Sequence, residues 1–401
     1  MKLFEIRSKF PTVNIISHTD LDGYGSAAAM VAFLSQTLGY HMDDIEVNHC
    51  FPSDPYDLKP GFNIITDLSV NSAGNWERMV EHNRNPENLI WWIDHHITSL
   101  DVIDKHPELK EIPRAINTGY AATMLCWEIH KISNLLGEHL GVEPFDVDSD
   151  DIFRMLNDEN YAAGIHAPTS VRLTDDWDLF KRKIPSSQFY NTAFNSCPRF
   201  YHDAKSPYCQ AAFGDIGFSD ERDRATVEDA ARYLIEFGED ATRWQRYLYL
   251  KNLMNAGFLC SLDPVDWHDE TADEIRKIRF ITVNRIDFNL VSGAESLMKE
   301  YTWGMAFQIR DTGVTHTVYC TRPSGNLSAK EVCYRFGGGG HPGCAGFVSN
   351  GMMIKNLAPL DDNMKLLIRK DLRDIRKQVA PPIENPDVDD LLRSRSKEVA
   401  I

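Results

Sequence analysis

Four short apolar runs in the first hundred residues each end near a polar or acidic side chain. They cover residues 13–16, 45–51, 63–66 and 89–93. The segment after the first run places apolar residues at the spacing of one helix face, namely Ala27, Met30, Val31, Leu34 and Leu38. Residues 73–82 show a weaker helical pattern. Strands that alternate with helices in this way predict an α/β domain with a parallel, doubly wound sheet and right-handed crossovers.

Carboxylates and imidazoles stand directly after three of these runs. The residues concerned are His18, Asp20, Asp22, Asp67, Asp94, His95 and His96. Ligands of such sheets bind just beyond the carboxyl ends of parallel strands, so we expect these side chains on one rim. A set of oxygen and nitrogen donors suits divalent cations. The structural alternatives are an Asp-rich turn with a helix cap in the first stretch, a capped turn at Asp67, and hydrogen-bonded core histidines.

The middle of the chain contains a further helix start and an acidic cluster. Thr118 is a candidate N-cap for the helix that follows it. Three acids, Asp175, Asp176 and Asp178, surround Trp177. They form either a solvated turn or a further part of the same rim.

The remaining chain predicts a linker, a second small domain and a helical tail. Residues 184–219 show no clear period and are expected to form an irregular insertion, with a lid as one interpretation. Residues 226–253 predict a helix that joins two domains and lets a cleft close. Strand-like runs follow at residues 280–283, 303–309 and 315–320. A helical stripe expected to dock on its own chain comprises Met364, Leu367, Ile368, Leu372 and Ile375. The last twenty residues are expected to be disordered.

A run of four glycines at residues 337–340 precedes His341. Without side chains, their backbone N–H groups can approach an anion closely, although a flexible loop is the alternative. Arg322 and Arg335 favour a clamp for a terminal phosphate or a nucleotide. Arg335 is equally well explained by an ordinary surface ion pair.

The composition narrows the class of protein. With 401 residues, of which 43% are hydrophobic and 25% charged, the chain is expected to form two or three soluble domains. The formal net charge of −17 argues against broad contact with a long nucleic-acid duplex, but not against a small anionic substrate. Eight cysteines without a C-x-x-C pair favour a reducing cytoplasm. No run approaches the ~20 apolar residues of a membrane span, and we expect neither a signal peptide nor a membrane partner.

Two motifs resemble the DHH phosphoesterase family. Asp94-His95-His96 after an apolar run, with His18-x-Asp20-x-Asp22 before it, is similar to the signature of the DHH domain. The glycine-rich stretch at residues 337–346 is similar to the signature of the DHHA1 domain. Both motifs occur in the family's order, so the resemblance covers about residues 10–350. The glycine motif separates the chain from family-II pyrophosphatases and exopolyphosphatases, and the chain most resembles the short-oligonucleotide hydrolases, the nanoRNases.

The resemblance implies a fold of two α/β domains. A DHH domain with a mainly parallel, doubly wound sheet is joined by a helical linker to a smaller DHHA1 domain. The expected parts are a catalytic domain at residues 1–183, an insertion and linker at 184–277, a substrate-binding domain at 278–358 and a helix with a tail at 359–401.

The resemblance also implies a two-metal centre, usually of manganese, with magnesium as the alternative. The implied ligands are His18, Asp20 and Asp67 for one ion, and Asp22, Asp67, His95 and Asp176 for the other. Asp178 is the fallback for Asp176. Asp94 is expected to orient the ring of His95, because a ligating imidazole normally donates its other N–H to a carboxylate. His96 is expected to face the substrate phosphate.

One departure from the family pattern concerns His18, which lies two residues before Asp20, whereas many relatives have a spacing of four. RecJ-like exonucleases use the shorter spacing with an aspartate in the first place, so the role of His18 is the least secure. On the substrate side, Thr321-Arg322-Pro-Ser324 resembles a phosphate-contacting segment. The implied clamp comprises Arg322, Ser324, Arg335, Gly338, Gly339, Gly340 and His341.

We therefore expect a metal-dependent phosphodiesterase that cuts short oligonucleotides or dinucleotides into 5′-mononucleotides. Two neighbouring cations can activate a hydroxide and neutralise the charge that develops on the phosphate. The enzymatic alternatives are hydrolysis of cyclic or linear signalling dinucleotides, hydrolysis of 3′,5′-bisphosphate nucleotides, and RecJ-like digestion of single strands. The non-enzymatic alternative is a nucleotide-binding module. A homodimer is left open by the sequence.

Overall fold

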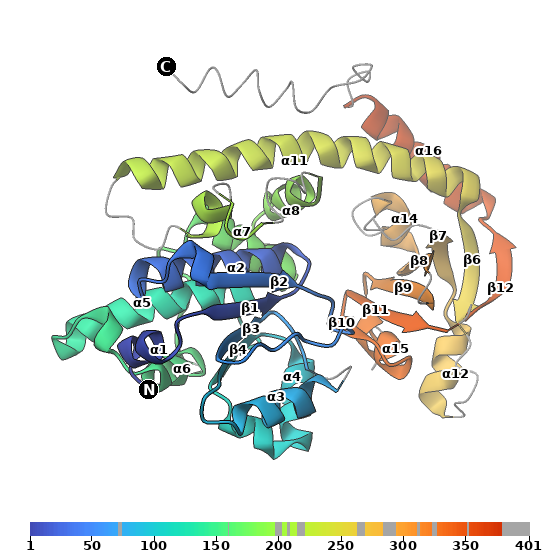
Figure 1. The fold of residues 1–401 in the computed structure, drawn as a ribbon. Coiled ribbons are helices and arrows are strands. Elements are labelled where there is room, and N and C mark those ends of the chain that lie inside the picture. The colour runs from blue at the N-terminus through green and yellow to red at the C-terminus, as the bar shows by residue number, and fades with distance from the viewer. Residues whose placement is uncertain are drawn as a thin grey trace. The chain divides into compact units, whose positions relative to one another are not determined.

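The structure is a computed structural model of the chain, and its contacts divide the chain into two units. It describes residues 1–70, 74–158, 160–196, 203–206, 209–214, 221–262, 269–283, 294–310, 313–322, 327–350 and 353–378. The first unit comprises Met1–Thr242 with Gly339–His341, and the second comprises Arg243–Gly338 with Pro342–Ile401. Both units contain helices and strands (Figure 1). Helix α11 (Glu221–Ala256) carries the chain from one unit into the other.

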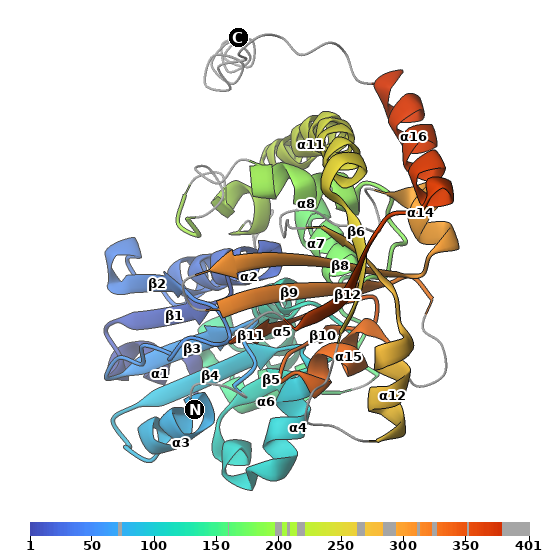
Figure 2. The same ribbon diagram turned by 90° about the vertical axis from the view of Figure 1, so that its right-hand side faces the viewer.

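The first unit is built on a five-stranded parallel sheet with the strand order β2-β1-β3-β4-β5 (Figure 2). Its strands are β1 (Val13–Ser17), β2 (Ile45–His49), β3 (Phe62–Thr66), β4 (Leu89–Asp94) and β5 (Arg114–Ile116). The register aligns Ser17 with His49 and with Thr66, so neighbouring strands end in one row. The first four strands confirm the prediction, whereas the three-residue β5 is too short to show a period.

Helices cover both faces of this sheet. They include α1 (Leu3–Lys9), α2 (Leu21–Ala32), α3 (Asn75–Asn83), α4 (Ile97–Lys105), α5 (Ala122–Leu140), α6 (Ser149–Leu156), α7 (Thr169–Asp178) and α8 (Ser187–Ser196). Ile15 and Trp91 share a core with residues of α2 and α5, while Ile16 and Trp92 share one with residues of α3 and α4. Because successive strand residues face opposite sides, this division confirms the doubly wound arrangement. Helix α8 also corrects the expectation that the whole of residues 184–219 is irregular.

The start of helix α5 differs from the prediction that Thr118 is its N-cap. The helix begins at Ala122, and the cap residue Ala121 supplies no side-chain hydrogen bond. Instead, the backbone N–H groups of Ala122 and Thr123 each donate to the carboxylate of Asp22 at 2.8 Å. A carboxylate distant in sequence thus satisfies the free N–H groups of the first turn, which local sequence does not reveal.

The second unit is built on a mainly antiparallel sheet with the order β10-β11-β9-β8-β7-β6-β12, in which β7 and β8 are parallel. Its strands are β6 (Phe258–Leu262), β7 (Phe280–Val283), β8 (Trp303–Arg310), β9 (Gly313–Cys320), β11 (Cys344–Ser349) and β12 (Ile354–Pro359). The sheet also includes β10 (Gly339–His341), whose residues are grouped with the first unit. Its helices, besides the end of α11, include α12 (Glu270–Lys277), α14 (Glu295–Glu300), α15 (Ala329–Arg335) and α16 (Asp362–Arg376). Strands β7, β8 and β9 confirm the three predicted in this part of the sequence.

The predicted C-terminal stripe is buried on its own chain. Met364, Ile368 and Ile375 of α16 lie in one core with Leu253 of α11 and Leu297 of α14. The docking prediction is therefore confirmed, while the predicted disordered tail lies outside the described residues. Among the helices that the structure describes, none combines the length and apolarity needed to cross a bilayer.

Candidate metal centre

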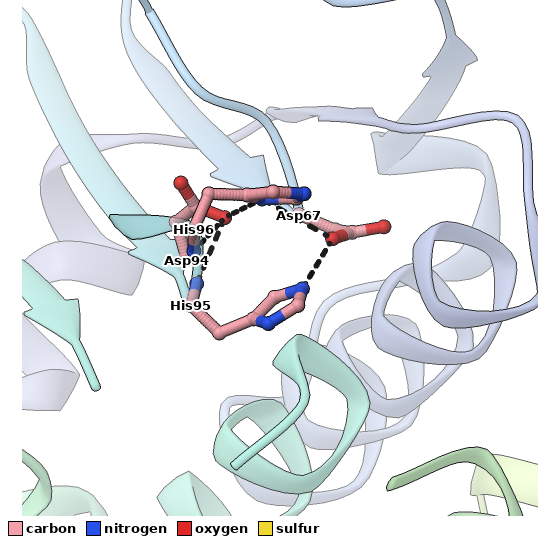
Figure 3. Close-up of side chains that lie close together, drawn as sticks. All are labelled: Asp67, Asp94, His95 and His96. Atoms are coloured by element: carbon pink, nitrogen blue, oxygen red, sulfur yellow. Dashed lines mark hydrogen bonds and ion pairs between the residues drawn. The ribbon is translucent and has the colours of Figure 1, made fainter. Parts of the chain in front are cut away.

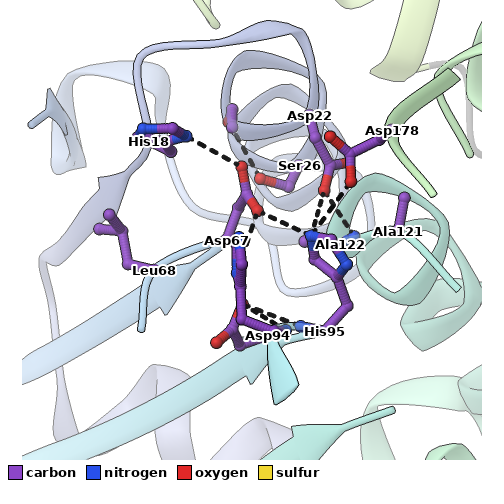
Figure 4. Close-up of polar contacts among 12 residues, drawn as sticks. His18, Asp22, Ser26, Asp67, Leu68, Asp94, His95, Ala121, Ala122 and Asp178 are labelled. Atoms are coloured by element: carbon purple, nitrogen blue, oxygen red, sulfur yellow. Dashed lines mark hydrogen bonds and ion pairs between the residues drawn. The ribbon is translucent and has the colours of Figure 1, made fainter. Parts of the chain in front are cut away.

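Side chains from five segments converge where β1, β3 and β4 end (Figure 4). The side chains form three sets, and within each set the donor atoms lie within 4.8 Å of one another. The sets are His18, Asp20 and Asp67; Asp67, Asp94, His95 and His96; and Asp22, His95 and Asp178. We call His18 and Asp20 the outer group, and Asp22, His95 and Asp178 the inner group. The seven predicted rim residues therefore all belong to these sets, because their strands are parallel and in register.

Asp67 directly follows strand β3 and lies between the two groups. Its Oδ1 is 3.2 Å from His95 Nε2 of the inner group, and its Oδ2 is 3.7 Å from His18 Nδ1 of the outer group. The Oδ2 atom is buried and accepts no hydrogen bond from the residues that the structure describes. The residue has φ 56°, a left-handed conformation that Asp adopts more readily than most residues. One carboxylate thus points an oxygen toward each group.

The inner group concentrates negative charge around one imidazole nitrogen. His95 Nε2 lies 3.2 Å from Asp178 Oδ2 and 3.5 Å from Asp22 Oδ2, in addition to its contact with Asp67. Burial raises the pKa of all three carboxyls, and for Asp67 the charges of other acids in the cluster raise the pKa further. A single N–H cannot compensate three buried carboxylates, whose charged forms are costly without a counter-charge. The charge of these carboxylates must therefore be neutralised, either by protons on the carboxyl groups or by bound cations.

The outer group is a largely self-compensated ion pair. Burial opposes charge on both partners, but the 2.8 Å contact between His18 Nδ1 and Asp20 Oδ2 prevails, lowering the pKa of Asp20 and raising that of His18. Asp20 Oδ1 also accepts from the N–H of Gly23 at 3.0 Å. A Cβ atom at Gly23 would lie 2.3 Å from the carbonyl oxygen of His18, so only glycine fits this turn. His18, the least secure prediction, does lie within the cluster.

Asp94 orients His96 rather than the ring of His95 (Figure 3). Its Oδ1 accepts from the backbone N–H of His95 at 2.8 Å and contacts His96 Nδ1 at 2.7 Å, while Oδ2 accepts from Ser99 Oγ. Alternate residues of an extended chain point to the same side, so Asp94 reaches the ring two residues on. His95 Nδ1 is buried without a hydrogen-bond partner among the described residues. The predicted Asp94–His95 ring contact is therefore wrong.

The structure replaces Asp176 with Asp178 as the acid from α7. Asp176 Oδ1 accepts from the N–H of Lys183 and Oδ2 accepts from Ser187 Oγ, both at 2.7 Å, so this carboxylate holds the chain after the helix. Asp178 instead faces His95. Neighbouring helix positions differ by about 100°, so residues two apart point in different directions. Asp175 caps Ala121, which indicates that positions 175 and 178 share the face toward the centre.

The donor set fits a pair of divalent cations. Within the described part of the chain, Asp67 Oδ2 and Asp178 Oδ2 are buried without hydrogen-bond partners, although buried polar atoms are almost always satisfied. Carboxylate oxygens with a few imidazole nitrogens are ligands that Mn²⁺ and Mg²⁺ accept. The outer and inner groups, each completed by Asp67, offer two adjacent sets of donors.

The predicted phosphate-contacting residues belong mainly to the second unit. Arg322 is exposed just beyond β9, and Ser324 lies outside the described residues. Arg335 Nη1 lies 2.8 Å from Asp269 Oδ2, which supports the alternative of a surface ion pair. The antiparallel pairing of Tyr319 with Cys344 brings the end of β9, next to Arg322, beside the chain that follows the glycine run.

The glycines of the predicted clamp serve different needs. At Gly338 a Cβ atom would lie 2.0 Å from the carbonyl oxygen of Gly346, so close packing requires this glycine. Gly340 has φ 133°, which side-chain-bearing residues rarely adopt. The contacts of Gly339–His341 group these residues with the first unit. Their role as an anion clamp stays a prediction.

Comparison with known proteins gives weak structural likenesses. No protein-family model and no curated protein matches the sequence. The chain is similar to RecJ from Thermus thermophilus in complex with Mn²⁺, at 15% identity over 95% of this chain and 54% of that one, with a TM-score of 0.42. It is similar to the DHH domain of PF0399, a member of the s1p family of ribosomal proteins, at 13% identity over 94% and 88%, with a TM-score of 0.44. The pGpG-specific phosphodiesterase PggH from Vibrio cholerae gives 12% identity over 91% and 99%, with a TM-score of 0.31. Likenesses of this strength do not establish a family or an activity.

Proposed function

We propose that this chain is a metal-dependent phosphoesterase that hydrolyses short oligonucleotides, including dinucleotides, to 5′-mononucleotides. The observation that carries the proposal is the position of Asp67 between two donor groups, with one oxygen toward each. A protein that only binds nucleotides has no need of a carboxylate shared by two cation sites. The resemblance of the sequence motifs to DHH phosphoesterases supplies the substrate class.

Some residues of the chain would bind the metal ions, and others would position the substrate phosphate. Asp67, with the outer and inner groups, would bind the ions at a fixed separation. Divalent cations bound there polarise a phosphoryl oxygen and lower the pKa of an attacking water. His96, fixed through Nδ1 by Asp94, would contact the phosphate. In the hydrolysis, the oxygen of water bonds to phosphorus, the P–O3′ bond breaks, and the leaving 3′-oxygen takes a proton.

The proposal is tested with the purified protein, added Mn²⁺ or Mg²⁺, and a size series of 5′-phosphorylated strands. We expect Mn²⁺-dependent release of mononucleotides, fastest with substrates of two to about five nucleotides. Asp67→Ala should reduce the rate by roughly 10³-fold or more, because both donor groups lose their shared ligand. Asp101→Asn, which changes an exposed carboxylate on α4, is the matched control and should keep full activity.

Three outcomes would contradict the proposal in different ways. Preference for strands longer than about 10 nucleotides would indicate a RecJ-like exonuclease. Faster release of phosphate from 3′,5′-bisphosphate nucleotides, or faster opening of cyclic dinucleotides, would indicate a phosphoesterase with a different preferred substrate. Binding of Mn²⁺ without turnover of any of these compounds would indicate a nucleotide-binding module.

A further inference from the structure

An exposed aromatic ring stands beside the outer group. Phe51 is 47% exposed and lies two residues beyond the end of β2. Its ring centroid lies 6.5 Å from that of His18, and the two planes meet at 78°. Single exposed apolar side chains are common on protein surfaces, and Phe4 and Phe145 are exposed too. The position of Phe51, rather than its exposure, therefore needs an explanation.

The backbone that carries Phe51 is held in place by a short series of hydrogen bonds. Its N–H donates to Asp54 Oδ2 and its carbonyl accepts from the N–H of Asp54, both at 2.9 Å. Asn75 Nδ2 donates to the carbonyl of Asp54 at 3.0 Å, which ties the turn to helix α3. Immediately before the ring, the N–H of Cys50 continues the pairing with β1 by donating to the carbonyl of Ser17 at 2.9 Å.

The chain after this turn is anchored as well. Tyr56 is buried, its N–H donates to Asn75 Oδ1 at 3.0 Å, and its hydroxyl donates to the carbonyl of Ser69 at 2.8 Å. The exposed ring of Phe51 is thus presented from a turn fixed on both sides. A pre-organised group loses little conformational entropy when a ligand packs against it.

Local charge indicates what part of a substrate would meet this ring. Asp20, whose side chain is 46% exposed, and Asp54 lie on the same side of the centre as Phe51. A second phosphate placed there would be repelled by these carboxylates. A neutral planar group would not, and every nucleobase offers a π-face on which an aromatic side chain can stack.

We propose that Phe51 is a stacking platform for the nucleobase on the outer-group side of the scissile phosphate. This inference rests on the proposed function and narrows it. The substrate must carry a planar base next to the phosphodiester, which selects nucleotides over polyphosphate chains. Because stacking does not read the pattern of hydrogen-bond donors and acceptors on the base, the platform should accept all four bases.

The test compares Phe51→Ala with the wild-type protein on a dinucleotide and on the same dinucleotide lacking one base. For the intact dinucleotide we expect KM to rise about 5- to 100-fold with little change in kcat, the range found when an aromatic that stacks on a base is removed. With an abasic residue at the position that meets Phe51, KM should be the same in both proteins. Phe51→Trp should restore KM. Phe4→Ala, which removes a similarly exposed ring from α1, should leave all values unchanged.

A binding measurement separates this inference from the proposed function. A dinucleotide containing 2-aminopurine, added with Ca²⁺ in place of Mn²⁺, should lose fluorescence on wild-type protein and on Phe51→Trp, but not on Phe51→Ala. Equal quenching by wild type and Phe51→Ala, or an equal rise in KM for the intact and the abasic substrate, would overturn the stacking role. Quenching that depends on Phe51 in a protein that hydrolyses nothing would keep the platform and reject the phosphoesterase.

Discussion

The outer and inner groups of the centre use the same residue types but are stabilised in opposite ways. In the outer group, His18 and Asp20 form a close pair in which each stabilises the charge of the other. In the inner group, one imidazole faces the carboxylates of Asp22 and Asp178 together with that of Asp67, and Oδ2 of Asp178 has no hydrogen-bond partner among the described residues. The outer group is therefore stable without ions, whereas the inner group is incomplete without them. Donor identity alone does not tell how strongly a cluster requires a metal.

The largest effect is expected when two acids of helix α7, Asp178 and Asp176, are replaced in turn. Asp178→Ala should weaken Mn²⁺ binding and turnover by at least about 10–100-fold, the cost of losing even an outer-shell partner of a metal ligand. The metal-free protein should be no less stable, because one of the three carboxylates that share the single imidazole of His95 is removed. Calorimetric Mn²⁺ titration and thermal unfolding measure the two effects.

Asp176→Ala is the matched variant and should show the reverse pattern. It removes the side-chain acceptor of the Lys183 N–H and leaves the Ser187 hydroxyl only the carbonyl of Ile184, so the free energy of unfolding should fall by about 1–3 kcal/mol. Mn²⁺ affinity should remain within a few-fold of wild type. An equal loss of affinity in both variants would contradict the separation of the two acids.

The pH dependence of ion binding should come mainly from the inner group. Burial raises the pKa of Asp22, Asp67 and Asp178, and protons therefore compete with cations at pH values above the ordinary carboxylate pKa of about 4. Cations bind the deprotonated forms, so affinity should increase with pH and fall on acidification. Titrations carried upward from the ordinary carboxylate pKa of about 4 should show proton release with each ion bound. Affinity that does not change over this range would contradict the raised pKa values.

The smallest effect is expected from the outer group. In His18→Ala, water can occupy the place of the imidazole, which is 21% exposed, so we expect turnover to fall by only about tenfold, near the low end of the range for groups around a metal. The inner group should still bind its ion with nearly unchanged affinity. A loss as large as that in Asp178→Ala would show that the two groups depend on the ions equally.

The sequence predicts which side chains come together at the metal centre better than it predicts their individual contacts. Parallel strands end at one edge, so placing His18, Asp67 and His95 after strands was enough to bring them together. The choice of Asp176 failed because the start of α7, and hence the direction of each residue, is not marked by a local cap. Whether Asp94 contacts the ring of His95 or that of His96 depends on the backbone conformation after β4, which the identity of the side chains does not define. Short β5 and the capping of α5 by Asp22 arise from contacts distant in sequence.

Asp22 gives ion loading a consequence beyond the reaction. Its two oxygens accept from the first N–H groups of the nineteen-residue helix α5, and Oδ2 also lies 3.5 Å from His95 Nε2 within the inner group. Cations bound there would fix this carboxylate and, through it, the beginning of the helix. Removing the cations with a chelator should therefore speed hydrogen–deuterium exchange in the first turn of α5, which is distant in sequence from the histidines. The stability of the folded protein would then depend on the supply of divalent metal.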